Sequence, residues 1–233
     1  MSRLTSAAAA FAELAEVNDY FLVGTGPVDG HWQPVQQLYT DAGLLDGVIA
    51  RVRRRIDADE RRTAASIFFL GFAARLWSIS VGAVVGHHLL PDLAPEQLLF
   101  REVDGAVELH MERPTGRAGE NLADMLADLV LDSHLTPLAT ALQPVSREVL
   151  RGNAASALLG AARAYDLHQG SGLAWQLARR LCADERLSGT VRFTKTSYRR
   201  TGCCLYYRAR NGGLCGDCAL THVPGTVGRK DAS

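Results

Sequence analysis

The strongest constraint on the fold of this chain is a long, mostly apolar run from Ser66 to Leu90. The run is long enough to cross a bilayer as a helix. Arg75 lies in its interior, however, and an arginine at the middle of a membrane costs about 2.5–3.5 kcal/mol even on insertion scales. We therefore expect a buried core helix, with peripheral membrane association as the alternative.

The spacing of apolar residues predicts helices on both sides of this run as well. One region differs, because the β-prone runs Leu98–Val103 and Ala106–Met111 flank an Asp-Gly pair, a good two-residue hairpin turn. The prediction is an α+β protein with a mainly α-helical body and one β-hairpin. The expected helical segments are Leu4–Tyr20, Gln33–Asp57, Glu60–Leu90 with a break near Gly82 or Gly86, Gly119–Ala141, Ser146–Leu167 and Gly172–Ala183.

Positive charge and cysteine are concentrated at the C-terminal end. The whole chain has a formal net charge of zero, but from residue 190 onward eight bases stand against only Asp217 and Asp231. The same segment holds four of the five cysteines, after a short extended stretch near Val191–Ser197. We therefore divide the chain into a helical body, residues 1–189, and a small basic, cysteine-rich module, residues 190–233.

Composition and charge argue against several classes of protein. With 47% hydrophobic and 21% charged residues the chain resembles an ordinary globular protein, and its zero net charge offers no general attraction to nucleic acid. The arginines of 51–55 lack the second helix and tight turn of a helix-turn-helix, so we expect no nucleic-acid partner. The N-terminal segment MSRLTSAAAAFAELAEV is interrupted by Glu13 and Glu16 and does not have the pattern of a secretory signal. We expect a reducing cytoplasm, where clustered cysteines bind metal more often than they form disulfides.

The four clustered cysteines lie in the stretch CCLYYRARNGGLCGDC and are Cys203, Cys204, Cys215 and Cys218. Four thiolates suit a structural Zn²⁺ or an iron–sulfur cluster. Cys215 and Cys218 have the two-residue spacer of a zinc-binding turn, but adjacent residues in an extended strand point to opposite faces, so Cys203 and Cys204 suit one ion poorly. A [2Fe–2S] cluster relaxes this demand, because each of its two irons needs only two thiolates. The spacing favours iron–sulfur over zinc and leaves open which cysteines share an iron.

The segment RTGCCLYYRARNGGLCGDC, which begins at Arg200, resembles the C-terminal [2Fe–2S] signature of the ferric siderophore reductase family, the FhuF-like proteins. It matches the C-C-x₁₀-C-x₂-C ligand order of that family at every cysteine. The upstream stretch LRGNAASALLGAAR, Leu150–Arg163, is similar to a helical segment that these proteins carry before the module. The resemblance implies a [2Fe–2S] cluster whose iron ligands are Cys203, Cys204, Cys215 and Cys218.

The resemblance also implies an oxidoreductase of bacterial iron acquisition. One-electron reduction of Fe³⁺ in a siderophore, of the hydroxamate type, would release Fe²⁺ in the cytoplasm, at the inner face of the membrane if the chain associates with it. No flavin- or nicotinamide-binding element is visible in the sequence, so electron transfer requires an external donor such as a ferredoxin or a flavin reductase. No catalytic residue is needed beyond the cluster. The alternative function is a non-catalytic electron carrier or a redox or iron sensor.

Two alternative roles are predicted for several other side chains. The basic residues beside the cysteines either attract an anionic chelate or an acidic donor or are simply solvated; they are Arg199, Arg200, Arg208 and Arg210. Asn153 and Ser156 either face a substrate cleft or pack within the helices. His222 either lies near the cluster or on the surface, and Cys182 is expected to be a small buried core residue.

Overall fold

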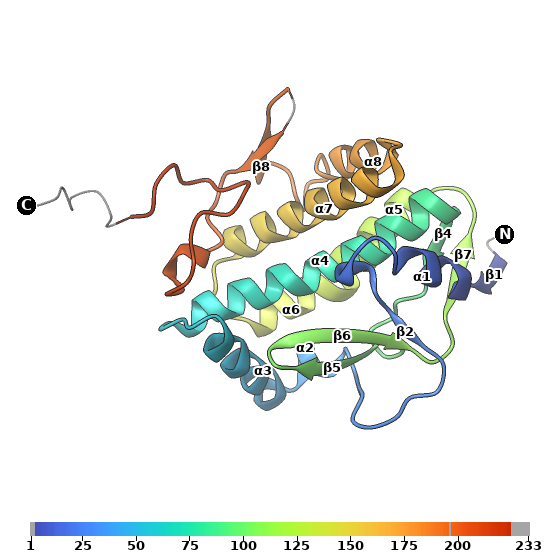
Figure 1. Cartoon of the computed structure of the whole chain (residues 1–233), viewed down its shortest axis with the longest axis horizontal. Helices are drawn as coiled ribbons and strands as arrows, with labels where there is room; N and C mark the ends of the chain where they lie inside the picture. Colours follow the sequence, from blue (N-terminus) through green and yellow to red (C-terminus); the bar gives the residue numbers. More distant parts are fainter. Residues whose placement is uncertain (1–2, 196, 225–233) are drawn as a thin grey trace, which may run out of the picture.

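A computed structural model describes residues 3–195 and 197–224 of the chain. Its centre is α4 (Arg61–His87), which is flanked by α7 (Arg147–Gln169), α3 (Ala42–Arg55) and α1 (Ala8–Leu14). Figure 1 shows α4 and α7 side by side and running in the same direction, with the C-terminal segment against the ends at which both helices begin.

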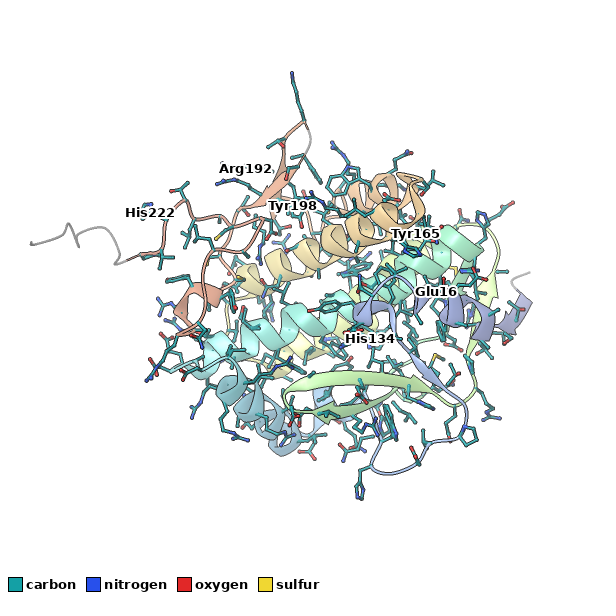
Figure 2. The ribbon with its side chains drawn as sticks, in the orientation of Figure 1. Glu16, His134, Tyr165, Arg192, Tyr198 and His222 are labelled. Atoms are coloured by element: carbon teal, nitrogen blue, oxygen red, sulfur yellow. The ribbon has the colours of Figure 1, made fainter. Side chains whose placement is uncertain are left out.

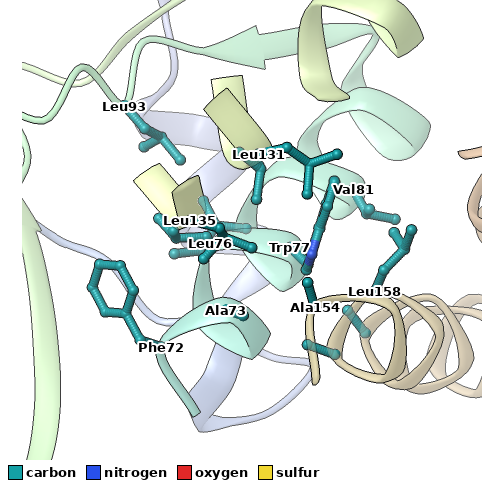
Figure 3. Close-up of a cluster of buried hydrophobic side chains, with 14 of the residues drawn as sticks. Phe72, Ala73, Leu76, Trp77, Val81, Leu93, Leu131, Leu135, Ala154 and Leu158 are labelled. Carbon is teal, nitrogen blue, oxygen red and sulfur yellow. The ribbon is translucent and has the colours of Figure 1, made fainter. Parts of the chain in front are cut away.

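The long apolar run is a core helix, as predicted. Trp77 of α4 is fully buried, and Figure 3 shows it between Leu131 and Ala154, which belong to two different neighbouring helices. Among the described residues α4 is the one helix long and apolar enough to cross a membrane, and 67% of its apolar window is buried inside the protein. The apolar surface of this helix is therefore largely covered by the chain itself.

The predicted break near Gly82 or Gly86 is wrong, because α4 is continuous through both glycines. A Cβ atom at Gly82 would collide with Leu14 of α1, and a Cβ atom at Gly86 would collide with the Tyr165 hydroxyl of α7. The two glycines therefore allow neighbouring elements to approach the helix closely. The helix ends instead at His87, and the next residue, His88, takes the left-handed backbone conformation with φ 49°.

The predicted N-terminal helix, Leu4–Tyr20, is wrong in its first part. Residues Arg3–Ser6 form strand β1, which pairs antiparallel with β7 (Thr115–Ala118), and β7 in turn pairs with β4 (Leu89–Pro91). Strand pairing with a distant partner thus outweighs the local helical preference. The helix α1 covers only the middle of the predicted segment, and a short 3₁₀ turn, η1, follows at Asp19–Phe21.

The predicted helix Gln33–Asp57 is divided into three elements. Gln33–Pro34 forms strand β3, which is followed by the short helix α2 (Gln37–Thr40) and then by α3. Asp41 separates the two helices, because its side chain accepts a hydrogen bond of 2.9 Å from the Leu44 backbone N–H and so caps α3.

The predicted hairpin is confirmed with nearly the predicted bounds. It consists of β5 (Leu99–Val103) and β6 (Ala106–Met111), joined by Asp104 and Gly105, which both have positive φ. Positive φ at both central residues is what a type I′ turn requires. β3 adds to the β5 edge, and β2 (Gly24–Thr25) adds to the β6 edge, so the sheet has the order β2-β6-β5-β3.

The remaining body is helical, as predicted. The predicted segment Gly119–Ala141 consists of α5 (Leu122–Ala127), the π-helical η2 (Asp128–Leu135) and α6 (Thr136–Ala141). The predictions Ser146–Leu167 and Gly172–Ala183 correspond to α7 and to α8 (Leu173–Leu181).

The C-terminal segment has little regular structure. β8 (Val191–Phe193) and β9 (Tyr198–Arg200) form a small antiparallel ribbon, and a single 3₁₀ turn, η3 (Tyr206–Arg208), interrupts the cysteine loops. The α+β class with a cysteine-bearing C-terminal region is confirmed. The division into domains 1–189 and 190–233 stays a prediction.

Candidate metal centre

The four clustered cysteines lie on loops that follow β9 and pack against the helical body. Cys204 and Cys218 are buried, whereas Cys203 and Cys215 are half-buried. Figure 2 shows the orientation of this segment: Tyr198 points toward the body and His222 lies on its outer side. The segment therefore has an inner edge in contact with the helices and an outer edge that reaches solvent.

The backbone conformation around Cys203 and Cys204 explains how two cysteines with no residue between them can both lie in the site. Leu205, directly after the pair, has a left-handed backbone with φ 70°, so the chain turns sharply there. Cys203 and Cys204 differ in burial, as expected for neighbours that point to opposite sides. The turn brings Cys204 Sγ to 3.8 Å from Cys215 Sγ. Two sulfurs held tetrahedrally by one metal at about 2.3 Å are about 3.8 Å apart.

Backbone amides donate to two of the sulfurs. Leu205 N–H lies 3.3 Å from Cys203 Sγ, and Leu220 N–H lies 3.4 Å from Cys218 Sγ. Cys218 N–H donates to the Cys215 carbonyl at 3.1 Å, which closes the CGDC turn. Such contacts orient the sulfurs and tune a bound cluster.

A buried arginine contacts the third sulfur. Arg200, which ends β9, is only 3% exposed. Its Nη2 donates to Cys215 Sγ at 2.8 Å and to Asp217 Oδ1 at 3.1 Å, while its Nη1 donates to Asn153 Oδ1 at 2.8 Å. Its Nε makes an ion-pair contact of 3.0 Å with Asp217 Oδ2 without the alignment of a hydrogen bond.

The contacts continue into the two central helices. Asn153 Nδ2, on α7, donates to both the carbonyl and the hydroxyl oxygen of Ser66 on α4, each at 2.9 Å. Ser66 Oγ donates in turn to the Cys204 carbonyl at 2.8 Å. A second link runs from Ser156 Oγ to Asp217 Oδ2 at 2.6 Å. Asn153 and Ser156 are buried and face the cysteine segment, so neither of them lines an open cleft.

The thiols of the close pair do not titrate alike. The hydrogen bond with Cys215 lowers the pKa of Cys204, and the nearby Arg200 charge lowers it further against the effect of burial. The same hydrogen bond, with burial, raises the pKa of Cys215. The pair therefore releases its first thiol proton more readily than a free cysteine does and retains its second proton. A bound metal must displace this second proton. Burial raises the pKa of Cys203 as well.

The basic residues predicted to attract a partner have different surroundings. Arg200 contradicts the prediction, because a side chain this buried directs its charge at Asp217 and Cys215 and not at solvent. Arg208 pairs with Glu60 at 2.5 Å, and Arg210 lies 3.7 Å from Asp57. These pairs join the segment to the α3–α4 loop.

Arg199 is exposed on β9, next in sequence to the buried arginine, and no ion pair of its side chain occurs among the described residues. Attraction of a partner by Arg199, Arg208 and Arg210 stays a prediction. His222 is exposed, and its Nδ1 lies 3.2 Å from the Thr221 hydroxyl. Cys182 is buried at the end of α8, where burial raises its pKa to about 12, so it is a core residue as predicted.

Sequence reasoning missed Ser66 and Asp217 as parts of this site, and it placed Arg200 beside the cysteines without predicting its burial or its contacts. Asp217 stands between Cys215 and Cys218, and Arg200 stands three residues before Cys203, so a position next to the ligands is a usable signal. Ser66 is distant in sequence and lies in an apolar helix, so only the packing of α4 against the cysteine loops could reveal it.

The donor set suits a two-iron cluster. Among the residues that the structure describes, no three His, Cys, Asp or Glu side chains converge on a single metal ion. Four thiols are nevertheless gathered in one short segment, two of them at the separation expected for a shared metal, and amide or guanidinium donors reach three sulfurs. Sulfur ligation in pairs is what a [2Fe–2S] cluster needs.

Fold and site together define an iron–sulfur protein with a helical body. Residues 200–220 match the family model described as the FhuF 2Fe-2S C-terminal domain. No curated protein matches the chain. The cofactor is therefore a [2Fe–2S] cluster, and the protein is related to siderophore-iron metabolism through this domain, whose match begins at Arg200 and includes all four clustered cysteines.

Proposed function

We propose that this protein is a ferric-siderophore reductase of the bacterial cytoplasm, with Cys203, Cys204, Cys215 and Cys218 as the iron ligands. The observation that carries the proposal is the placement of the four thiols within the matched domain, two buried against the helices and two half-buried toward solvent. A redox centre must be close to the surface to exchange electrons with a separate molecule, and Cys203 and Cys215 mark the edge that meets this need.

The reaction is a single-electron transfer. Hard oxygen ligands of a siderophore hold Fe³⁺ far more tightly than the less charged Fe²⁺. The bound cluster supplies one-electron redox chemistry. The balance is one electron from an external donor, such as a reduced ferredoxin or a flavin reductase, to one ferric chelate, which yields Fe²⁺ and the intact ligand. A trap for Fe²⁺ can draw an unfavourable step forward, since 59 mV corresponds to a tenfold change in a one-electron equilibrium.

The protein's own residues hold and shield the site in this proposal. The distance between Cys204 Sγ and Cys215 Sγ supports their binding one iron, which leaves Cys203 and Cys218 for the other. Leu205 and Leu220 donate amide hydrogen bonds to the sulfurs of that second pair. The exposed Arg199 offers a positive charge on the surface for an anionic chelate or an acidic donor protein.

The test starts with the full-length protein purified in air. We expect the visible absorption of a [2Fe–2S] protein and, after reduction with dithionite, an EPR signal from a single unpaired electron. A colourless protein that holds one zinc ion would refute the ligand proposal.

The activity test follows with the reduced holoprotein. Mixing it with ferric hydroxamates and a ferrous trap should reoxidise the protein and form the trapped Fe²⁺ in equal amounts. Cytoplasmic fractionation of the producing cells tests the location. If no ferric chelate reoxidises a protein that does carry the cluster, the reductase proposal fails, and an electron carrier or sensor replaces it.

A further inference from the structure

Arg200 occupies an unusual position for a charged residue. Among the residues that the structure describes, it is the one Lys, Arg, Asp or Glu that is buried. A buried charge is costly unless it is paired and hydrogen-bonded, so its position requires specific partners. Asp217 supplies the opposite charge. The guanidinium of Arg200 has further N–H donors, and one of them donates to the sulfur of Cys215.

The contact between Arg200 and Cys215 differs from the other contacts to sulfur. Its length is 2.8 Å, compared with 3.3 Å and 3.4 Å for the amide donors to Cys203 and Cys218. A donor that carries charge also makes a stronger hydrogen bond than a neutral amide. Arg200 is therefore the strongest donor to a sulfur of the site.

The helical body holds the arginine in this orientation. Asn153 of α7 accepts from Nη1, and Asn153 is itself fixed by its two hydrogen bonds to Ser66 of α4. Ser66 also donates to the Cys204 carbonyl. Two helices thus position both Arg200 and the backbone of a neighbouring cysteine.

We propose that Arg200 raises the reduction potential of the [2Fe–2S] cluster through Cys215 Sγ, and that Asn153 and Ser66 are positioning residues that fix its orientation. Reduction adds negative charge to the cluster and its sulfurs, so a cationic donor to one sulfur favours the reduced form. The helical body then has a role in redox tuning besides any role in substrate binding. This inference rests on the proposed ligation by the cysteines and not on the reductase activity.

The first experiment compares two adjacent arginines in the holoprotein. Arg200→Gln removes the buried cation, and Arg199→Gln removes an exposed one from the same strand. Spectroelectrochemical titration of R200Q should show at least a tenfold shift of the one-electron equilibrium toward the oxidised form, which is about 59 mV. R199Q should stay within twofold of the wild type. Equal shifts in both variants, or none in R200Q, would overturn the proposal.

A second pair of variants separates the hydrogen bond from the charge. The double variant R200Q/D217N keeps the net charge of the buried pair at zero, so any potential it loses reflects the missing donor to Cys215. A wild-type potential in the double variant refutes the role of the hydrogen bond. Ser66→Ala should lower the potential in the same direction as R200Q but by less, and should alter the EPR g-values without loss of iron.

The proposal can still be tested if R200Q does not retain its cluster. If R200Q is isolated without iron, the reduction potentials of Arg200→Lys and S66A test the proposal instead. Lysine keeps the positive charge but cannot contact all the partners of the guanidinium. Lowered potentials in both support the proposal, and unchanged potentials in both contradict it. Failure of the reductase proposal is distinguishable, because a protein that reduces no chelate still yields a potential for each variant.

Discussion

A buried histidine in the helical body should make the stability of this protein depend on pH. His134 lies in η2 and is fully buried. Its Nδ1 is 2.7 Å from the Tyr39 hydroxyl, and its Nε2 is 2.7 Å from the Leu93 carbonyl. The neutral ring satisfies both contacts by donating to the carbonyl and accepting from the hydroxyl. Burial lowers the pKa of His134 from 6.5 to about 4, because the charged ring loses its hydration.

The magnitude follows from the linkage between protonation and folding. The unfolded chain binds a proton at His134 below pH 6.5, whereas the folded chain binds it only near pH 4, so the stability provided by the neutral ring is lost as the pH falls between these values. The loss in the free energy of unfolding is about 2 kcal/mol at pH 5 and about 3 kcal/mol near pH 4. Above pH 7 the stability provided by the neutral His134 ring is fully present.

The assay is urea unfolding of the wild type and of His134→Gln at pH 8 and pH 5, monitored by far-UV circular dichroism. Glutamine is polar but does not titrate, so the free energy of unfolding of the wild type should fall by about 2 kcal/mol more than that of the variant. Acid effects on carboxylates are common to both proteins and cancel in this difference. An equal fall in both proteins would show that His134 is not the buried neutral group inferred from its contacts.

Three further predictions concern the site and the packing of the body. Cys204→Ser should lose or severely destabilise the cluster, whereas Cys182→Ser should retain it; equal iron contents would refute the ligand assignment. Gly82→Ala should lower the free energy of unfolding by about 1–3 kcal/mol because its Cβ meets Leu14, while Gly71→Ala, with open space around it, should be neutral or stabilising by up to about 1 kcal/mol. Removal of iron by a chelator should disorder the cysteine loops yet leave cooperative unfolding of the body, since the continuous hydrophobic core lies almost entirely within residues 1–189, with Tyr198 as the one buried member beyond them among the described residues; loss of all helical signal would contradict the division into two domains.

Local signals in the sequence were sufficient for some elements. The Asp104-Gly105 pair predicted the hairpin with nearly the observed bounds, because a type I′ turn needs positive φ at both positions. Helix α7 was likewise predicted to within two residues at each end. Both elements are specified by residues close together in the chain.

Other elements depended on distant partners. Arg3–Ser6 has helix-forming neighbours but pairs as a strand with Thr115–Ala118, more than one hundred residues later. The sequence predicts a helix break near Gly82 or Gly86, although the close approach of Leu14 gives Gly82 a packing role inside a continuous helix. Neither partner can be identified from the spacing of nearby residues.

The sequence by itself determined the four cysteines and their match to a [2Fe–2S] domain, since ligand identity and spacing are local properties of the chain. Only the tertiary structure decided how those cysteines are surrounded. It buried Arg200, which looked like a surface charge, and placed it between Asp217 and Cys215. It also brought Ser66, from an otherwise apolar helix, to the backbone of Cys204. The physical reason is that burial and hydrogen-bond partners depend on how α4 and α7 pack against the cysteine loops, and that packing joins residues more than a hundred positions apart.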